Sequence, residues 1–321
     1  MIDDPFLVND WHPVCRSGQL GEGGVLGTRL LGEDLVLWRD NGTVLAWRDL
    51  CVHRGTRLSL GKVKDSCLVC PYHGWTYGKE GQCILIPAHP DRTPPSRARA
   101  HTYQARERYG LVWVTLGQPQ LDVPPYPDWD NPDFRKVFCG PYEFKAGAPR
   151  AIENFLDIAH LSFVHDGILG DSTRPEIPDY TAVIGPDGIE AKGVGCFAPD
   201  MYGTGDEMVF WTYRVSRPLT AYLVSENDGP KYSLVLFVTP RSTLESTGWA
   251  YLGFDSPVDQ TDEEISAWQD SVTFQDMPIV ESQRPELLPL DLQEELHLRS
   301  DRLAVAYRRW LRELGVTFAT A

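Results

Sequence analysis

Two short segments near the N-terminus each combine a thiol with an imidazole. Residues 51–55 read Cys-Val-His-Arg-Gly, and residues 70–75 read Cys-Pro-Tyr-His-Gly-Trp. Cysteine thiolates hold one iron of a two-iron, two-sulfide cluster, and in one variant two histidines hold the other iron. Each segment must then supply one ligand to each iron, as two β-hairpin tips facing each other across the metals would do. The candidate ligands are Cys51, His53, Cys70 and His73.

A structural zinc ion is the alternative for this set, because zinc also accepts two cysteines and two histidines. Zinc loops usually pair cysteine with cysteine and histidine with histidine, whereas each segment here mixes the two. The pattern therefore favours the cluster. A zinc protein would be colourless, whereas the cluster absorbs visible light.

A second candidate site lies in residues 150–167, which are predicted to form a helix that ends at Gly167. This segment contains Asp157, His160 and His165. Either histidine alone would be interpreted as a core residue bonded to a neighbour. Residues five apart on a regular α-helix point about 140° away from one another. Both imidazoles can therefore reach one metal only if the helix is broken or widened between them, for example by a π-type turn.

A third candidate is Asp276, in a helix predicted to begin after Thr261 with the capping box Thr-Asp-Glu-Glu. Counting about 100° per residue places Asp276 on the apolar stripe of this helix, with Ile265, Trp268, Val272 and Val280. A carboxylate on a buried face is costly unless it is paired or bound to a metal. A buried salt bridge or a cap to another helix is the alternative.

Other residues of this helix have simpler interpretations. Glu263, Asp270 and Glu281 are expected on the opposite, solvated face. Pro278 is expected to disturb the helix just past it.

At residues 51–55 and 70–75 the sequence resembles the Rieske motif of the Rieske-type non-heme iron oxygenases. Other positions of the family motif also match, namely Gly55, Pro71, Tyr72, Gly74 and Trp75. Val52 departs from the pattern, since the family more often has proline there, but this position ligates nothing. Residues 154–165 resemble the mononuclear iron motif of the same family, and the run 274–276 with Glu281 nearby fits its late carboxylate.

This resemblance implies a role for each candidate residue. A Rieske [2Fe-2S] cluster would be bound by Cys51, His53, Cys70 and His73. A mononuclear Fe(II) would be bound by His160, His165 and Asp276. Asp157 would link a mononuclear-site histidine to a cluster histidine, here His73, of an adjacent subunit in a homotrimer.

The resemblance also implies a reaction. The chain is expected to be a terminal oxygenase (alpha) component of the vanillate and dicamba O-demethylase branch. It would activate O2 at Fe(II) with electrons from the cluster, and hydroxylate or oxidatively demethylate a small organic molecule rather than act as a cis-dihydroxylating dioxygenase. A non-catalytic Rieske electron carrier is the alternative, but it would have no need for the residues of the mononuclear site. The chain lacks a Gly-rich dinucleotide fingerprint, so electrons from NAD(P)H are expected to come through a reductase or ferredoxin.

Short strands are predicted to position the first two segments. They cover residues 25–30, 35–39, 43–48, 67–70, 83–87 and 111–115, separated by turns such as Asn41-Gly42, as in a small antiparallel barrel or sandwich. A proline-rich stretch at 117–132 is predicted to be a stiff linker. The expected domains are therefore an all-β domain at 1–118 and a catalytic domain at 119–321, and the fold class is α+β.

The second domain is predicted to hold a meandering antiparallel sheet. Its strands cover 189–195, 208–216, 221–225, 233–239 and 248–254, with turns at 185–188 and 227–229. A last helix is predicted from Ser300-Asp301 to Gly315. The resemblance implies that helices cover this sheet in a helix-grip, START-like domain. Four strand aromatics line either a cavity or the core: Trp211, Tyr213, Tyr222 and Phe237.

The amino-acid composition excludes some classes of binding partner and location. The 321 residues carry a net charge of −15, with a pI near 4.9, which argues against nucleic acid or an anionic membrane as partner. No apolar run is long enough to span a bilayer, and the chain opens with acids where a signal peptide would carry Lys or Arg, so a cytoplasmic location is expected. The five cysteines outside the motif are expected to be buried, reduced thiols: Cys15, Cys67, Cys83, Cys139 and Cys196.

Overall fold

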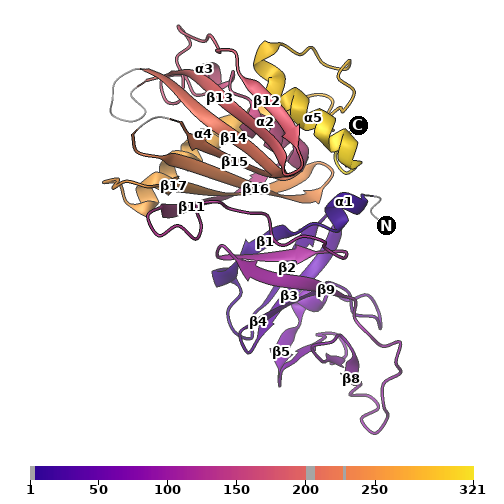
Figure 1. Ribbon diagram of the computed structural model, residues 1–321. Coiled ribbons are helices and arrows are strands. Elements are labelled where there is room, and N and C mark those ends of the chain that lie inside the picture. Colours follow the sequence, from indigo (N-terminus) through magenta and orange to yellow (C-terminus); the bar gives the residue numbers. More distant parts are fainter. Residues whose placement is uncertain (1–3, 200–206, 227–228) are drawn as a thin grey trace. The chain divides into compact units, whose positions relative to one another are not determined.

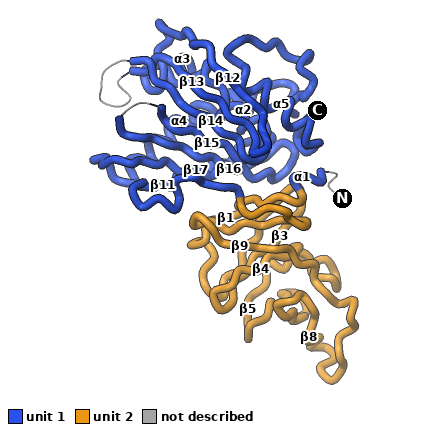
Figure 2. Tube along the Cα trace, in the orientation of Figure 1, with its two compact units in different colours: residues 1, 3–7, 124–321 blue, residues 2, 8–123 orange. Residues whose placement is uncertain are grey.

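The computed structural model describes residues 4–199, 207–226 and 229–321. The chain divides into two compact units (Figure 2). The first runs from Val8 to Val123, and the second from Pro124 to the C-terminus together with residues 4–7. The division falls after Val123, within the proline-rich stretch and past the expected boundary at residue 118.

Contacts of the linker explain where the division falls. The Leu121 carbonyl accepts a hydrogen bond from the indole of Trp11 (3.1 Å), which holds this part of the linker in the first unit. Asp128, beyond the division, accepts hydrogen bonds from Tyr222 Oη (3.0 Å) and Ser233 Oγ (2.6 Å) in the sheet of the second unit. The stretch is therefore tied down at both ends.

The first unit is built from two antiparallel sheets (Figure 1). In spatial order, the larger sheet contains β1 (His12–Arg16), β10 (Leu111–Thr115), β9 (Thr102–Arg108), β4 (Thr43–Arg48), β3 (Glu33–Asp40) and β2 (Val25–Leu30). The smaller sheet contains β5 (Lys62–Lys64), β6 (Cys67–Val69), β7 (Thr76–Tyr77) and β8 (Cys83–Leu85). A core of buried aromatic and aliphatic side chains, including Trp38, Trp47 and Tyr77, extends from the larger sheet to the smaller one.

The second unit contains one seven-stranded antiparallel sheet. Its spatial order is β11 (Arg135–Phe144), β17 (Glu245–Phe254), β16 (Tyr232–Ser242), β15 (Thr220–Ser225), β14 (Glu207–Arg217), β13 (Gly188–Ala198) and β12 (Thr181–Gly185). From β12 to β17, each strand pairs with the next one along the chain, and β17 also pairs with β11. Strands that are buried on both faces read as continuous apolar runs, and β17 is buried over most of its length.

Helices cover this sheet (Figure 1). The main ones are α2 (Ala148–Leu156), which packs on β16 and β17, α4 (Asp262–Ser282), which packs on β11, and α5 (Arg302–Leu314), which packs on β12 and β13. The shorter helices are α1 (Pro5–Val8), α3 (Leu161–Val164) and the 3-10 turns Ser17–Gln19, Leu58–Leu60 and Arg299–Asp301. The α+β class predicted from the sequence is confirmed.

Most predicted strands lie within observed ones, but β1, β5, β7, β9, β11 and β12 were not predicted. Of these, β7 has two residues and β5 three, too few for a pattern to show, and β9 is largely exposed and polar. The predicted turn at Asn227-Asp228 lies outside the described residues. The capping box of α4 is confirmed, because Glu264 N–H donates to Thr261 Oγ1 (3.2 Å) and Thr261 N–H to Glu264 Oε2 (2.8 Å).

Two predictions about α4 were wrong. The helix continues past Pro278 to Ser282. Pro278 has no N–H to donate to the carbonyl of Phe274, but Phe274 is exposed, so water can reach that carbonyl. Asp270 and Glu281 are not simply solvated, because Asp270 Oδ1 accepts from Tyr142 Oη (2.8 Å) and Glu281 Oε1 accepts from Lys145 N–H (3.0 Å). Both contacts anchor α4 to β11 and the chain just after it.

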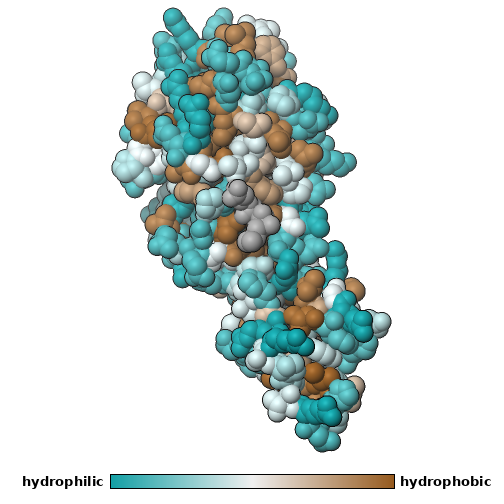
Figure 3. Space-filling model, turned by 90° about the vertical axis from the view of Figure 1, so that its right-hand side faces the viewer, coloured by the Kyte–Doolittle hydropathy of each residue, from teal (hydrophilic) through white to brown (hydrophobic). Residues whose placement is uncertain are grey.

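Hydrophilic side chains cover most of the face seen in Figure 3, and hydrophobic ones show in separate patches. Among the described residues, no helix is long and apolar enough to cross a bilayer. None of the seven cysteines forms a disulfide. Cys67 is half-buried rather than buried, because it lies at the start of a short strand near the surface.

Candidate functional site

The two Cys-His segments form loops with the same backbone turn. In the first, Cys51 N–H donates to the carbonyl of Thr56 (2.8 Å), and Gly55 N–H donates back to the Cys51 carbonyl (2.9 Å). The second loop repeats both bonds at Cys70, at 2.9 and 3.1 Å. Gly55 and Gly74 have φ values of +72° and +67°, in the left-handed region that favours glycine. Each loop therefore presents its cysteine and histidine in a similar way.

The strands that flank the two loops pair differently. The second loop is the tip of the β6–β7 hairpin, as expected. The first is not a hairpin tip, because β4 pairs with β3 and β9 whereas β5 pairs with β6. It is instead a connection from the larger sheet to the smaller one. The expectation of two facing hairpin tips was therefore wrong for the first loop.

The two cysteines of these loops are more deeply buried than the two histidines. Cys51 and Cys70 are each only 2% exposed, whereas His53 is half-buried and His73 is exposed. The two imidazole centroids lie 4.6 Å apart, and the indole of Trp75 stacks on His53 at 4.5 Å. Thiols inside and imidazoles outside give the asymmetric ligand set that a cluster with two different irons requires.

Electrostatics at the buried end favour a bound cation. Burial raises the pKa of the Cys70 thiol, and its contact with the Cys51 thiol raises it further, while the backbone N–H groups of Tyr72 and His73 partly offset this. A positive partner such as iron would favour the ionised form of the Cys70 thiol. Tyr77, which is fully buried, places its Oη 3.1 Å from Cys51 Sγ.

In the second unit, the segment predicted as one helix over 150–167 is broken. The helix α2 ends at Leu156, and a single turn, α3, spans Leu161–Val164. Asp157 causes the break, because its Oδ1 accepts the N–H of Ala159 (2.9 Å) and so competes with the backbone pattern of a helix. His160 precedes α3 and His165 follows it, so the helix end expected between the histidines occurs at His165 and no π-turn is present.

The two histidines flank the single turn α3, and their side chains converge with a third side chain, on α4. His160 Nε2 lies 3.3 Å and His165 Nε2 3.1 Å from the same oxygen of Asp276, Oδ1, on α4. The candidate ligand atoms all lie within 4.8 Å of one another. Separations of about 3 Å are those of neighbouring positions around a metal with bonds of roughly 2.1 Å. The sequence had identified all three residues, and the structure brings them together.

Each of the three has a further polar partner. Asp157 Oδ2 lies 3.4 Å from His160 Nδ1. Asn154 Nδ2 donates to Asp276 Oδ1 at 3.4 Å, and Gln275 Oε1 lies 2.7 Å from His165 Nδ1. The sequence motif had indicated Asp157 and Asn154, but nothing in the sequence indicated Gln275 except its position next to Asp276.

The three groups interact electrostatically with one another. Burial alone would lower the pKa of His160, but hydrogen bonds to Asp157 and Asp276 outweigh it and raise the pKa to about 9. Burial would raise the pKa of Asp276, but hydrogen bonds from His160 and His165 lower it to about 2. The carboxylate is therefore ionised at neutral pH, as a metal ligand must be.

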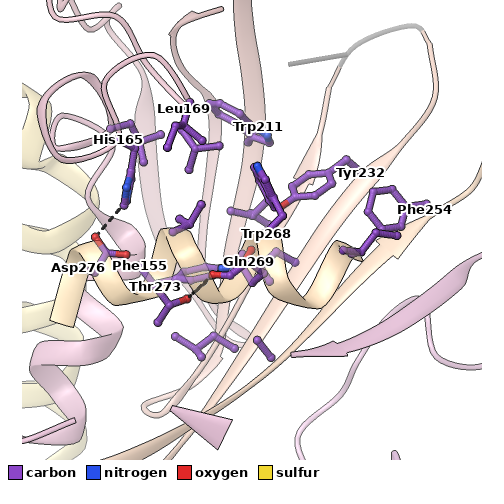
Figure 4. A pocket seen from close by; sticks show the side chains of 18 of the residues that line it. Phe155, His165, Leu169, Trp211, Tyr232, Phe254, Trp268, Gln269, Thr273 and Asp276 are labelled. Atoms are coloured by element: carbon purple, nitrogen blue, oxygen red, sulfur yellow. Dashed lines mark hydrogen bonds and ion pairs between the residues drawn. The ribbon is translucent and has the colours of Figure 1, made fainter. Parts of the chain in front are cut away.

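A cavity of about 1050 Å³ adjoins this triad (Figure 4). It runs along α4 from Asp276 and His165 toward Trp268, Tyr232 and Phe254. Of the four strand aromatics considered from sequence, Trp211 and Tyr213 line it. Tyr222 instead bonds to Asp128, and Phe237 is fully buried core. Trp268, expected on a buried stripe, is 39% exposed and lines the cavity.

Comparison with known proteins assigns a family to a part of each unit. Residues 10–104 match the family of Rieske [2Fe-2S] domains, and residues 144–317 match the vanillate O-demethylase oxygenase C-terminal domain. This chain is a Rieske non-heme iron oxygenase.

Individual relatives agree with this assignment. The methylxanthine N1-demethylase NdmA of Pseudomonas putida is 33% identical over 96% of this chain and 89% of its own length. The methylxanthine N3-demethylase NdmB of the same species is 32% identical over 98% of this chain and 91% of its own. The solved structure of NdmA with caffeine superposes with a TM-score of 0.84 at 30% identity, covering 96% of this chain and 90% of that one.

As a Rieske oxygenase, the chain uses a Rieske [2Fe-2S] cluster and a mononuclear Fe(II) that reacts with O2. Both sets of residues fit these groups. The first set joins two buried thiols with two imidazoles nearer the surface. The second joins two imidazole nitrogens with one ionised carboxylate, the donor set of non-heme Fe(II) oxygenases.

Proposed function

We propose that this oxygenase removes an N-methyl group from a small, uncharged heteroaromatic molecule. The observation that carries the proposal is the cavity beside His160, His165 and Asp276. Its walls are largely aromatic and aliphatic, and Lys231 is the single lysine or arginine among its described lining residues. In Figure 4, Tyr232, the neighbour of Lys231, lies at the end of the cavity away from Asp276. Apart from Lys231, the described lining residues offer a substrate carboxylate no lysine or arginine.

Two observations support a heteroaromatic ring. Phe155, Trp211 and Trp268 offer flat faces against which a planar substrate can pack. The relatives NdmA and NdmB are named as demethylases of methylxanthines. Both are similar to this chain along nearly its whole length.

One polar pair lies on the α4 wall of the cavity. Gln269 is only 7% exposed, and its Nε2 donates to Thr273 Oγ1 at 3.2 Å. Gln269 precedes Asp276 by two helical turns, which corresponds to roughly 10 Å along the axis. The distance between the Gln269 amide and the metal position therefore matches the length of a small bicyclic ring. We assign Gln269 the role of orienting the ring.

The metal ligands in this proposal are those that the sequence indicated. Cys51, His53, Cys70 and His73 hold the cluster, and His160, His165 and Asp276 hold the Fe(II). The iron supplies the site at which O2 is reduced. The aromatic walls hold the N-methyl group beside it and exclude bulk water, so that reducing equivalents are used on the substrate.

The reaction balances with two electrons. One O2, two electrons and two protons convert the methyl C–H bond to C–OH and release one water. The N–CH2–OH product then loses formaldehyde, and the ring nitrogen keeps the proton. NAD(P)H supplies the electron pair through a separate reductase or ferredoxin. A part of the Oxidoreductase NdmD of Pseudomonas putida, 19% of its length, is 46% identical to 35% of this chain.

The route between the two metal centres involves a second subunit. Asp157 borders His160, and its side chain is 37% exposed, so one carboxylate can accept from His160 Nδ1–H and from a histidine that approaches from outside. His73 is the exposed cluster histidine that fits this role. We propose a homotrimer in which His73 of one subunit faces Asp157 of the next.

A substrate panel tests the proposal. The full chain is incubated with NAD(P)H, a ferredoxin-type reductase and either caffeine, theobromine or vanillate, and formaldehyde, O2 consumption and product mass are measured. We expect formaldehyde and a product lighter by one CH2 from an N-methylated ring, with a higher KM in Gln269→Leu. Turnover of vanillate without turnover of any N-methylated ring would overturn the proposal.

A further inference from the structure

Both ring nitrogens of His165 face one turn of α4. Nε2 lies 3.1 Å from Asp276 Oδ1, and Nδ1 lies 2.7 Å from Gln275 Oε1. The His165 side chain is only 1% exposed, so water has little access to either nitrogen. We propose that Gln275 is a positioning residue that fixes the ring orientation and the tautomer of His165 for iron binding. This inference rests on the proposed ligand role of His165.

The chemistry of the pair determines which nitrogen is free. An amide oxygen can only accept a hydrogen bond, so the bond requires a proton on Nδ1. A neutral imidazole then has its lone pair on Nε2, the nitrogen that faces Asp276 and the candidate metal position. The opposite tautomer would put a proton where the metal must bind and would leave a lone pair facing the Gln275 oxygen. Gln275 therefore disfavours the form that cannot ligate.

The helix makes this arrangement rigid. Successive residues of an α-helix differ by about 100° in direction, so Gln275 and Asp276 can contact opposite edges of one imidazole. The α4 helix is fixed by its capping box at Thr261 and by the bond from Tyr142 Oη to Asp270. His165 itself is the C-cap residue of the short helix α3 and lies outside any long helix. The rigid element thus holds the ligand on the less regular one.

The two histidines of the site differ in their outer partners. His160 Nδ1 faces the carboxylate of Asp157 at 3.4 Å, whereas His165 Nδ1 faces a neutral amide at a shorter distance. A second carboxylate beside Asp276 would add negative charge in a largely buried site. Gln275 gives the acceptor without that charge.

A pair of variants at this position separates positioning from packing. Gln275→Leu keeps a side chain of similar size but has no acceptor, whereas Gln275→Glu keeps an acceptor at the same reach. The full-length protein with its cluster intact is depleted of mononuclear iron, and the dissociation constant for Fe(II) is measured by competition with a chelator. Cluster absorbance and circular dichroism verify the fold of each variant, and Gln275→Ala replaces the leucine variant if that one does not fold.

We expect Gln275→Leu to bind Fe(II) about 10–100-fold more weakly than the wild type, the usual cost of losing an outer partner of a ligating histidine. We expect Gln275→Glu to bind within a few-fold of the wild type. Wild-type affinity in Gln275→Leu, or equal weakening in both variants, would overturn the inference. His165→Ala is the reference: retained iron in that variant would reject the ligand assignment itself, whereas lost iron there with wild-type affinity in Gln275→Leu would reject the role of Gln275 alone.

Discussion

The Tyr77 hydroxyl lies 3.1 Å from Cys51 Sγ, and both side chains are buried in the first unit. A hydroxyl that donates to a cluster thiolate stabilises the reduced, more negative state more than the oxidised state. Hydrogen bonds to the sulfurs are among the factors that set the potential of iron–sulfur clusters. Because Cys51 is a proposed cluster ligand, the Tyr77 hydroxyl is predicted to affect the reduction potential of the cluster.

Replacing Tyr77 by phenylalanine should lower the midpoint potential of the cluster. A bond that is stronger by about 1 kcal/mol in the reduced state corresponds to roughly 40 mV for a one-electron couple. The measurement is a redox titration followed by visible absorbance. Tyr103→Phe, at a half-buried tyrosine of the same unit, serves as the control and should leave the potential unchanged. An unaltered potential in Tyr77→Phe would show that the hydroxyl does not donate to the cluster.

Removing the carboxylate of Asp276 should abolish mononuclear iron binding. Asp276→Ala leaves His160 and His165 without the anionic member of the set, while the first unit is untouched. We expect iron content to fall from three to two per chain, with the visible spectrum of the cluster retained. Normal iron occupancy in this variant would exclude Asp276 from the site.

Asp157 should be needed for electron transfer but not for holding iron. Asp157→Ala is expected to keep both metal centres and lose product formation. In the proposed homotrimer, mixed assemblies identify the subunit that donates the electron: a His73→Ala chain without the cluster is combined with an Asp276→Ala chain without mononuclear iron, each inactive alone. Regained activity indicates transfer between subunits, and no recovery in verified mixed trimers would reject it.

A buried ion-pair network should set the stability of the second unit. Arg308 on α5 contacts Glu153 on α2 at 2.5 Å, and its side chain is only 3% exposed. Arg308→Ala leaves the Glu153 carboxylate buried without this partner, which costs about 3–5 kcal/mol. We expect a lower urea midpoint for the second unit, measured by circular dichroism. Exposed Arg309, the next residue, provides the control, and Arg309→Ala should leave the midpoint nearly unchanged.

The same ion-pair network predicts that the stability of the second unit depends on pH. Burial tends to raise the pKa of Glu295, but hydrogen bonds from Arg150 and Arg308 hold it below its ordinary value of 4.5. The stabilisation is therefore complete above about pH 4.5 and is lost as the pH falls through the lower folded-state pKa. Glu295→Gln should reduce stability at pH 7 and flatten the loss between pH 5 and pH 3. An equally steep loss in the variant would contradict this role.

The fold class and the family could be predicted from the sequence, because the ligand types and spacings in residues 51–75 are specific. Asp276 could also be placed, since a carboxylate on an apolar helical stripe needs a partner. The break at Asp157 could not be predicted by counting periods, because it depends on a side-chain bond to Ala159 N–H that competes with the helix. Gln275 and Arg308 were missed because their partners are distant in sequence.

Single turnover tests the central claim most directly, namely that electrons of the cluster support oxidation at the site formed by His160, His165 and Asp276. The cluster of the full chain is reduced anaerobically, excess reductant is removed, and O2 is added with the N-methylated substrate identified from the panel. We predict that cluster reoxidation and formaldehyde release occur together in the wild type, and that Asp276→Ala releases no formaldehyde. Equal formaldehyde from Asp276→Ala, or release from wild type whose cluster stays reduced, would contradict the account.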